Sequence, residues 1–173
     1  NLARALSSQP FAKGDKIAIV TNGGGVGVMC TDSLVWNNLE LAELTKDTNN
    51  KFKEAVRNGV IPEHASLNNP IDIIGDATPD RYKTAMDIVL EDNNVNGLIV
   101  AFLFQSPALS EDIISKTAEM KKHGKPIVAI APGGKFADQI AHKIEEKGIP
   151  VYETPEEGVE VMRGLVEFGK YCR

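Results

Sequence analysis

A glycine-rich turn at residues 22–27 is the first place in this sequence where residue types and spacing suggest chemistry. Residues 20–32 read VTNGGGVGVMCTD, so the turn consists of Asn22, Gly23, Gly24, Gly25, Val26 and Gly27. Glycines let backbone N–H groups approach a ligand closely, and the helix expected after the turn adds about half a positive charge at its first residues. A phosphate group fits such a turn. The same glycines would also suit a turn that only packs tightly against a sheet.

The spacing of the glycines argues against a nucleotide cofactor at this turn. No Gly-Lys-Ser/Thr follows, as a Walker A loop requires. A dinucleotide-binding fingerprint needs a third glycine at position 28, which is Val28 here. Glu43 is only a loose candidate for the acid that would bind a ribose. We therefore interpret the turn as a site for a phosphoryl group or as a packing turn, with no nucleotide.

Further polar groups follow two other apolar runs and form a possible rim of the site. APGGKFAD contains Gly133 and Gly134 ahead of an expected helix, with Lys135 beside them, although two-glycine turns more often have a structural role. Gln105 and Ser106 follow the run 97–104 and supply side-chain hydrogen-bonding groups. Ser110, a little further on, is expected to cap the next helix.

The segment NNPIDIIGDA at residues 68–77 is unusually apolar for a loop. Pro70 favours an extended conformation for Asn69, and the isoleucines are expected to anchor the loop on the sheet. Asp72 either caps backbone amides or lines the site. Asn69 and Asp72 therefore complete the predicted rim.

The elements that must position these residues alternate between strand and helix. Apolar, β-branched runs predict strands, and capping residues and helical periodicity predict the helices between them. Thr78 with Pro79, and Thr154 with Pro155, are expected to begin two of the helices. The strands are expected at residues 16–22, 40–44, 97–104, 126–134 and 150–154. This pattern predicts a three-layer α/β/α, doubly wound, mostly parallel sheet of five strands with a flavodoxin-like arrangement.

Composition limits the class of protein. The chain has 173 residues and a net charge of −5, which argues against a nucleic-acid or anionic-membrane surface. No apolar run approaches the roughly 18 residues of a membrane span. The two cysteines, Cys30 and Cys172, form no metal-binding pattern, so we expect a reducing, cytoplasmic setting and no metal. Because the first residue is Asn1, we expect a piece of a longer protein, with residues 1–14 a helix end and linker and residues 15–173 one domain.

Three blocks of this sequence resemble one enzyme family. KIAIVTNGGGVGVMCTDSL, NNPIDIIGDATPDRYKTAMDIVLED and NVNGLIVAFLFQSP, in this order, are similar to the C-terminal part of the α subunit or α region of NDP-forming acyl-CoA synthetases. These enzymes include ADP-forming acetyl-CoA synthetases and are related to succinyl-CoA synthetase. The resemblance runs from about Leu2 to Val166, and it implies the flavodoxin-like domain of that family.

The resemblance implies an activity for the whole enzyme. The family converts an acid, CoA and ATP to acyl-CoA, ADP and phosphate through an acyl phosphate and a phosphohistidine. A mobile loop carries the phosphohistidine to an ATP-grasp domain or β subunit, and the turn at 22–27 matches a helix N-terminus that faces it. CoA, ATP or ADP and Mg²⁺ belong to the full enzyme, and none is expected on this fragment alone. The implied partners are the upstream CoA-binding and histidine-loop domains, the ATP-grasp part and phosphate.

The phosphorylated histidine of the family has no match here. In the family it lies in a Ser-His-Thr-Gly-like segment upstream of this region, and none of His64, His123 and His142 has that context. These three are expected to be surface or capping residues. We therefore expect no catalytic residue in this chain and no activity of the chain alone.

Two other function classes remain for comparison. A related, non-catalytic region in some protein acetyltransferases senses a ligand, and the sequence upstream of this chain would separate that role from the enzyme. A phosphate-receiver domain would need paired acids after the first strand, where Asn22 stands, and is disfavoured. On the first helix, Met29 is expected in the core, whereas Trp36 is as consistent with the core as with packing against a neighbouring domain.

Overall fold

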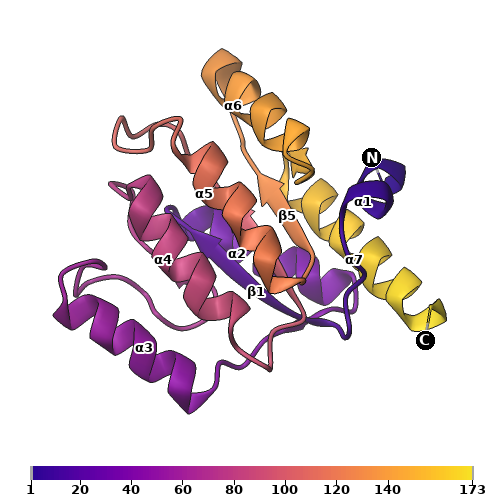
Figure 1. The fold of residues 1–173 in the computed structure, drawn as a ribbon, viewed down its shortest axis with the longest axis horizontal. Helices are drawn as coiled ribbons and strands as arrows, with labels where there is room; N and C mark the ends of the chain where they lie inside the picture. Colours follow the sequence, from indigo (N-terminus) through magenta and orange to yellow (C-terminus); the bar gives the residue numbers. More distant parts are fainter. Residues whose placement is uncertain (1, 173) are drawn as a thin grey trace.

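The computed structural model describes residues 2–172 and contains a parallel sheet between two layers of helices (Figure 1). The strand order is β2-β1-β4-β5-β6, with β3 also paired to β1. All these pairings are parallel. The strands are β1 (Lys16–Thr21), β2 (Glu40–Leu41), β3 (Ile71–Asp72), β4 (Gly97–Ala101), β5 (Ile127–Ile130) and β6 (Val151–Tyr152).

The flavodoxin-like prediction is confirmed, with one strand more than expected. Without β3, the order of the remaining strands is the doubly wound order with β1 next to β4. β3 was predicted to be part of an irregular segment. It pairs with Val20 and Thr21, beyond the point where β2 pairs with Lys16 and Ile17, so two short strands share one edge of β1.

The helices divide between the two faces of the sheet. One face is covered by α3, α4, α5 and α6, and the other by α1, α2 and α7 (Figure 1). The helices are α1 (Leu2–Ser8), α2 (Gly24–Trp36), α3 (Lys46–Arg57), α4 (Pro79–Leu90), α5 (Ile113–Glu119) with the 3₁₀ turn η1 (Met120–His123), α6 (Gly134–Glu146) and α7 (Pro155–Tyr171).

The central strands are buried because both of their faces are covered. In β1, Ala18 and Val20 join the core under α3 to α6, whereas Ile17 and Ile19 join the core under α1, α2 and α7. All four side chains are fully buried. This two-sided burial explains why the strands are continuously apolar in the sequence.

Helix starts follow the local sequence in most places. The side chains of Thr78 and Thr154 accept N–H groups three residues later, as predicted. The prediction that Ser110 caps α5 is wrong. Residues 110–113 form a turn closed by the Ile113 N–H and the Ser110 carbonyl at 3.2 Å, so α5 begins at Ile113 and its preceding residue is Asp112.

The N-terminal segment lies against α7. Ala5 is fully buried, and Leu2 contacts Gly164 so closely that a Cβ there would overlap it. Arg4 forms an ion pair with Glu145 of α6. The assignment of residues 1–14 to an upstream domain and linker stays a prediction. Among residues 2–172, no helix has the length and apolar composition to cross a membrane.

The outer side of α2 carries exposed apolar side chains around the exposed Asp32. The prediction that Met29 belongs to the core is wrong, because its side chain is 48% exposed. The buried residues of α2 are Gly27, Cys30, Ser33 and Leu34, which follow a different stripe of the helix. Trp36 is also on the surface, at 75% exposure.

Candidate functional site

The glycine turn joins the carboxyl end of β1 to the first residue of α2. Gly23 precedes the helix in an extended conformation, and its carbonyl accepts the N–H groups of Val26 at 3.1 Å and Gly27 at 3.3 Å. The Gly23 N–H itself donates to Thr21 Oγ1 at 3.0 Å. Three of the amides in the predicted site therefore have partners within the chain.

The amides of Gly24 and Gly25 have no hydrogen-bond partner among residues 2–172. They occupy the first two positions of a 13-residue helix, where backbone N–H groups have no carbonyl of their own helix to bind. No side chain caps this end of α2. The turn therefore offers two N–H donors together with the positive end of the helix dipole, which is a suitable arrangement for an anion.

Packing explains two of the four glycines. A Cβ at Gly23 would overlap the Leu103 side chain, and a Cβ at Gly27 would lie 3.3 Å from Thr21 Cγ2 and 3.4 Å from Pro70 Cβ. A Cβ at Gly25 would meet nothing within 4 Å. Gly23 and Gly27 thus allow close packing, whereas Gly25 lies open to the surroundings.

Asn22 holds the turn in place from inside. Its side chain is buried and bonds both backbone groups of Leu103, accepting the N–H at 2.9 Å and donating to the carbonyl at 3.0 Å. Tyr82 Oη on α4 also donates to Asn22 Oδ1, at 2.8 Å. Asn22 therefore links the ends of β1 and β4 and α4, and its side chain positions the turn.

Asp72 lies beside the turn, as a rim residue should. Its Oδ1 accepts the Ile74 N–H at 2.9 Å, which is the capping role considered for it. Its Oδ2 lies 3.0 Å from where a Cβ on Gly24 would be. The structure thus brings a carboxylate to the first turn of α2.

Asn69 is used inside the sheet. Its Nδ2 donates to the carbonyls of Ile17 and Ala42, both at 3.0 Å, and its Oδ1 accepts the Ile19 N–H at 2.9 Å. These bonds fill the edge of β1 between the stretches paired with β2 and β3. Sequence reasoning found Asn69 through its proline but gave no sign of this bridging role.

Of the remaining rim residues, Gln105, Gly133 and Gly134 lie together at the start of α6. Gly133 and Gly134 have φ values of 93° and 76°, which favour glycine and give both residues a structural reason. Gln105 Nε2 lies 3.7 Å from where a Cβ on Gly133 would be. Ser106 Oγ accepts the Ala108 N–H at 3.3 Å. Gln105 thus faces the start of α6, whereas Asp72 faces the start of α2.

Two of the three histidines, His64 and His142, lie on the surface as expected, whereas His123 is mostly covered, with 12% of its side chain exposed. His64 is exposed, and His142 has a side chain that is 74% exposed and lies 3.7 Å from Glu146. His123 Nε2 lies 2.8 Å from Asp87 Oδ1.

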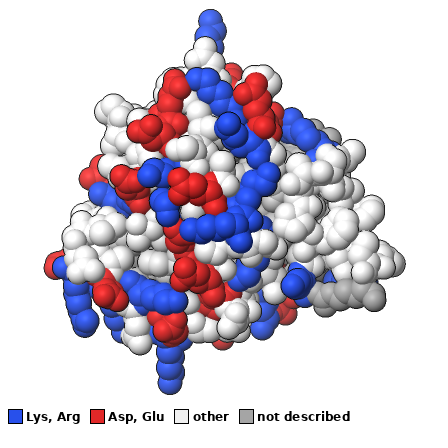
Figure 2. Space-filling view, viewed as in Figure 1, with Lys and Arg blue, Asp and Glu red and all other residues white. Residues whose placement is uncertain are grey.

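Asp87 is the centre of a charged cluster that also contains Lys83 and Lys122. Burial raises the pKa of the Asp87 carboxyl, but hydrogen bonds from Lys122, Lys83 and His123 outweigh it and lower the pKa to about 2. Figure 2 shows charges of both signs interspersed over this face of the molecule.

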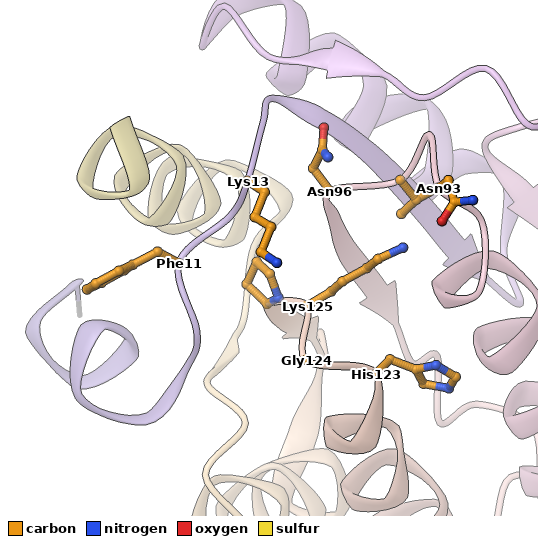
Figure 3. Close-up of a pocket in the computed structure, with 9 residues that line it drawn as sticks. Phe11, Lys13, Asn93, Asn96, His123, Gly124 and Lys125 are labelled. Carbon is orange, nitrogen blue, oxygen red and sulfur yellow. The ribbon is translucent and has the colours of Figure 1, made fainter. Parts of the chain in front are cut away.

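A cavity of about 250 Å³ lies at the amino ends of the strands, away from the glycine turn (Figure 3). It is lined by residues just before β1, β4 and β5, including Lys13, Asn96 and Lys125. The Lys125 ammonium donates to the Asp92 carbonyl at 2.6 Å, and His123 points away from Lys13 (Figure 3). The polar groups do not converge on one point, so the cavity is not a second candidate site.

No group of three or more His, Cys, Asp or Glu side chains that could hold a metal occurs among residues 2–172. At the glycine turn, the acidic side chain of Asp72 lies close to Gly24.

This chain is similar to parts of larger known ligases. The ADP-forming acetate–CoA ligase of Methanocaldococcus jannaschii is 35% identical over 173 residues, which are 97% of this chain and 24% of that protein. The α subunit of ADP-forming acetate–CoA ligase II of Pyrococcus furiosus is 31% identical over 98% of this chain and 37% of its own length. The chain therefore spans about a quarter to just over a third of these relatives.

Solved structures agree with these matches. The dinucleotide-forming acetyl-coenzyme A synthetase 1 of Ca. Korarchaeum cryptofilum superposes with a TM-score of 0.85 and 26% identity, over 99% of this chain and 36% of that one. The same synthetase has been solved in complex with phosphate and ADP. The family model described as "Ligase-CoA domain" matches residues 17–170. With almost its whole length matched, this chain is a member of the Ligase-CoA domain family.

Proposed function

We propose that this chain is the domain of an ADP-forming acid–CoA ligase that receives a phosphoryl group at the first turn of α2. The ligase as a whole would convert an acid, CoA and ATP to acyl-CoA, ADP and phosphate. The phosphoryl group would arrive on a histidine from another part of the protein. The similarity to acetate–CoA ligases supports the reaction class, and the glycine turn supports the role within it.

The pair of unpartnered amides at Gly24 and Gly25 carries this proposal. Phosphoryl oxygens hold negative charge, and N–H groups fixed in direction stabilise that charge without having to reorganise. The helix dipole adds to the same effect. The turn contributes no nucleophile and no base, so its role is to bind and orient the group while other residues react.

CoA, ATP or ADP, and Mg²⁺ are assigned to other parts of the ligase in this proposal. Mg²⁺ is commonly held by carboxylates together with substrate phosphates. Asp72 offers such a group beside the turn, but its Oδ1 already accepts the Ile74 N–H. The residues of this chain therefore fit a phosphoryl group better than a metal ion.

The test removes one amide and keeps the helix. Gly24→Pro deletes the N–H at the first helical position, where proline is well tolerated, and Gly23 already has the extended conformation that precedes a proline. Gly24→Ala is the matched control, because it places a similar Cβ beside Asp72 but keeps the N–H. Both variants are made in the full-length ligase, and ATP formation from acetyl-CoA, ADP and phosphate is measured.

We expect Gly24→Pro to lower turnover about 100-fold, as loss of one fixed donor to a developing oxyanion does, and Gly24→Ala to remain within about fivefold of the parent. Thermal unfolding of the two variants controls for stability. Equal activity of the two variants would show that the amide does not contact the phosphoryl group.

A further inference from the structure

Residues 2–12 run beside α7 in the opposite direction, and we call them the N-terminal strap (Figure 1). Leu2 lines a surface hollow with Val161 in the first half of α7, whereas Ala12 lies against Gly169 near the end of that helix. Because α7 begins after the end of β6, its first turns lie at the edge of the sheet that also holds the glycine turn. The strap therefore enters the domain from that edge and leaves it at the opposite one, where β1 begins.

Two glycines of α7 make room for the strap. A Cβ on Gly164 would overlap the Leu2 side chain, and a Cβ on Gly169 would overlap the Ala12 carbonyl oxygen. Both glycines lie inside a helix, where glycine is less favourable than alanine. The sequence of α7 therefore favours close docking of the strap over the stability of the helix by itself.

Gln9 fastens the strap to the sheet with both ends of its side-chain amide. Its Oε1 accepts the Ile127 N–H at 2.8 Å, and its Nε2 donates to the Gly148 carbonyl at 2.6 Å. Gln9 is only 6% exposed, so both bonds lie in surroundings where an unpaired polar group is costly. One side chain thus joins the strap to the first residue of β5 and to the turn after α6.

The helix within the strap depends on this docking. α1 has seven residues, and an isolated helix of that length is not stable in water. The Arg4 side chain adds an ion pair with Glu145 of α6 and lies over the Tyr152 ring of β6, with its central carbon 5.9 Å from the centre of the ring. The order of α1 therefore comes from its contacts with α6, α7 and β6.

We propose that the N-terminal strap is a rigid tether and that Gln9 is the residue that locks it. Any polypeptide joined to the N-terminal end of the strap is then held in a fixed direction, at the sheet edge of the glycine turn, and moves together with this domain. A flexible linker would instead let two neighbouring parts reorient independently. This inference does not depend on the proposed function, because it uses no contact of the glycine turn.

Backbone NMR order parameters of this chain test the tether directly. We expect values of about 0.85 for residues 4–9 in the parent, equal to those of α7, because a docked strap moves with the rigid backbone. Gln9→Ala removes both bonds and should lower the values for residues 4–9 below about 0.6, while α7 keeps its own and shows that the variant is folded. Ser7→Ala, at an exposed position of the same helix, is the matched control and should behave as the parent.

Gln9→Glu tests the lock with a side chain of the same shape. At pH 7 its carboxylate accepts the Ile127 N–H but cannot donate to the Gly148 carbonyl, so the strap should be released as in Gln9→Ala. At pH 4, close to the ordinary glutamic acid pKa of about 4.3, the protonated group donates again, and the high order parameters should return in Gln9→Glu but not in Gln9→Ala.

Two results would overturn the inference. Order parameters below about 0.6 for residues 4–9 of the parent would show that the strap is a flexible linker. Unchanged values in Gln9→Ala would show that Gln9 does not lock the strap.

Discussion

The Asp72 carboxylate lies against Gly24 at the start of α2: Oδ1 accepts the Ile74 N–H at 2.9 Å, and Oδ2 is 3.0 Å from where a Cβ on Gly24 would be. A fixed negative charge therefore stands next to two free amides. In the absence of a ligand, this charge interacts favourably with the helix dipole. When an anion binds, the same charge opposes it.

Replacement of Asp72 should strengthen anion binding. Asp72→Asn keeps an oxygen for the Ile74 N–H and removes the charge, so we expect sulfate or phosphate to bind this chain about three- to tenfold more tightly. Titration of the Gly24 and Gly25 amide signals by NMR measures the affinity. Asp32→Asn, which makes the same charge change two turns along α2, should have less effect. A weaker affinity for Asp72→Asn would mean that the carboxylate is a ligand-binding group.

The buried hydroxyl of Tyr82 should stabilise the fold and the turn together. It donates to Asn22 Oδ1 at 2.8 Å and lies 2.6 Å from the Ala101 carbonyl oxygen. Tyr82→Phe should lower the free energy of unfolding by about 1–2 kcal/mol, because polar groups at the end of β4 lose a partner. Urea denaturation measures the change. Tyr171→Phe, at a position 85% exposed, is the control and should change stability by less than about 0.5 kcal/mol.

The side chain of Asn69 should be worth more than an ordinary loop amide. Asn69→Ala removes three hydrogen bonds to the backbone of β1 and residue 42, and we expect a loss of about 3 kcal/mol in unfolding free energy. Amide exchange at Ile19 should accelerate more than at Ile99 in β4. Asn68→Ala, at an exposed neighbour, is the control. If both variants unfold at the same urea concentration, the three bonds contribute nothing net.

The carboxyl of Asp87 should make the free energy of unfolding depend on pH in the acid range. Its pKa falls from 3.8 in the unfolded chain to about 2 in the fold, so its contribution is present above about pH 4 and is lost as pH falls towards 2. We expect about 1 kcal/mol, because the lysine partners are partly in solvent and are screened. Urea denaturation between pH 2 and 6 should show this loss in the parent and not in Asp87→Asn. Asp47→Asn, at an exposed i,i+4 pair, should follow the parent curve.

The features that depend on residues close together in the chain could be predicted from the sequence. The caps at Thr78 and Thr154, the buried strands and their order all follow from nearby residue types or from the alternation of elements. The glycine turn was found in the same way. Of the residues named there, Gly23 and Gly27 turned out to have packing reasons, and Gly24 and Gly25 have the free amides.

The features that were missed depend on distant partners. β3 contains two residues, too few for a periodic pattern, and exists because β1 leaves Val20 and Thr21 unpaired by β2. Met29 was placed in the core because methionine is usually buried, but Asp32, one turn further on, lies on the same side of α2 and is exposed. The bonds of Asn22 to Leu103 and of Asn69 to Ile17 cross 81 and 52 positions of sequence, which no local motif records.

The side-chain amide of Asn69 also helps to prevent aggregation at this edge of the sheet. An open margin of a sheet invites another polypeptide to add a strand and begin aggregation. Here the edge beside β1 consists of the two-residue strands β2 and β3 with the Asn69 side chain between them. Another polypeptide therefore finds no continuous row of free backbone groups with which to pair. The segment that brings Asp72 to α2 therefore also limits strand addition at this edge of the sheet.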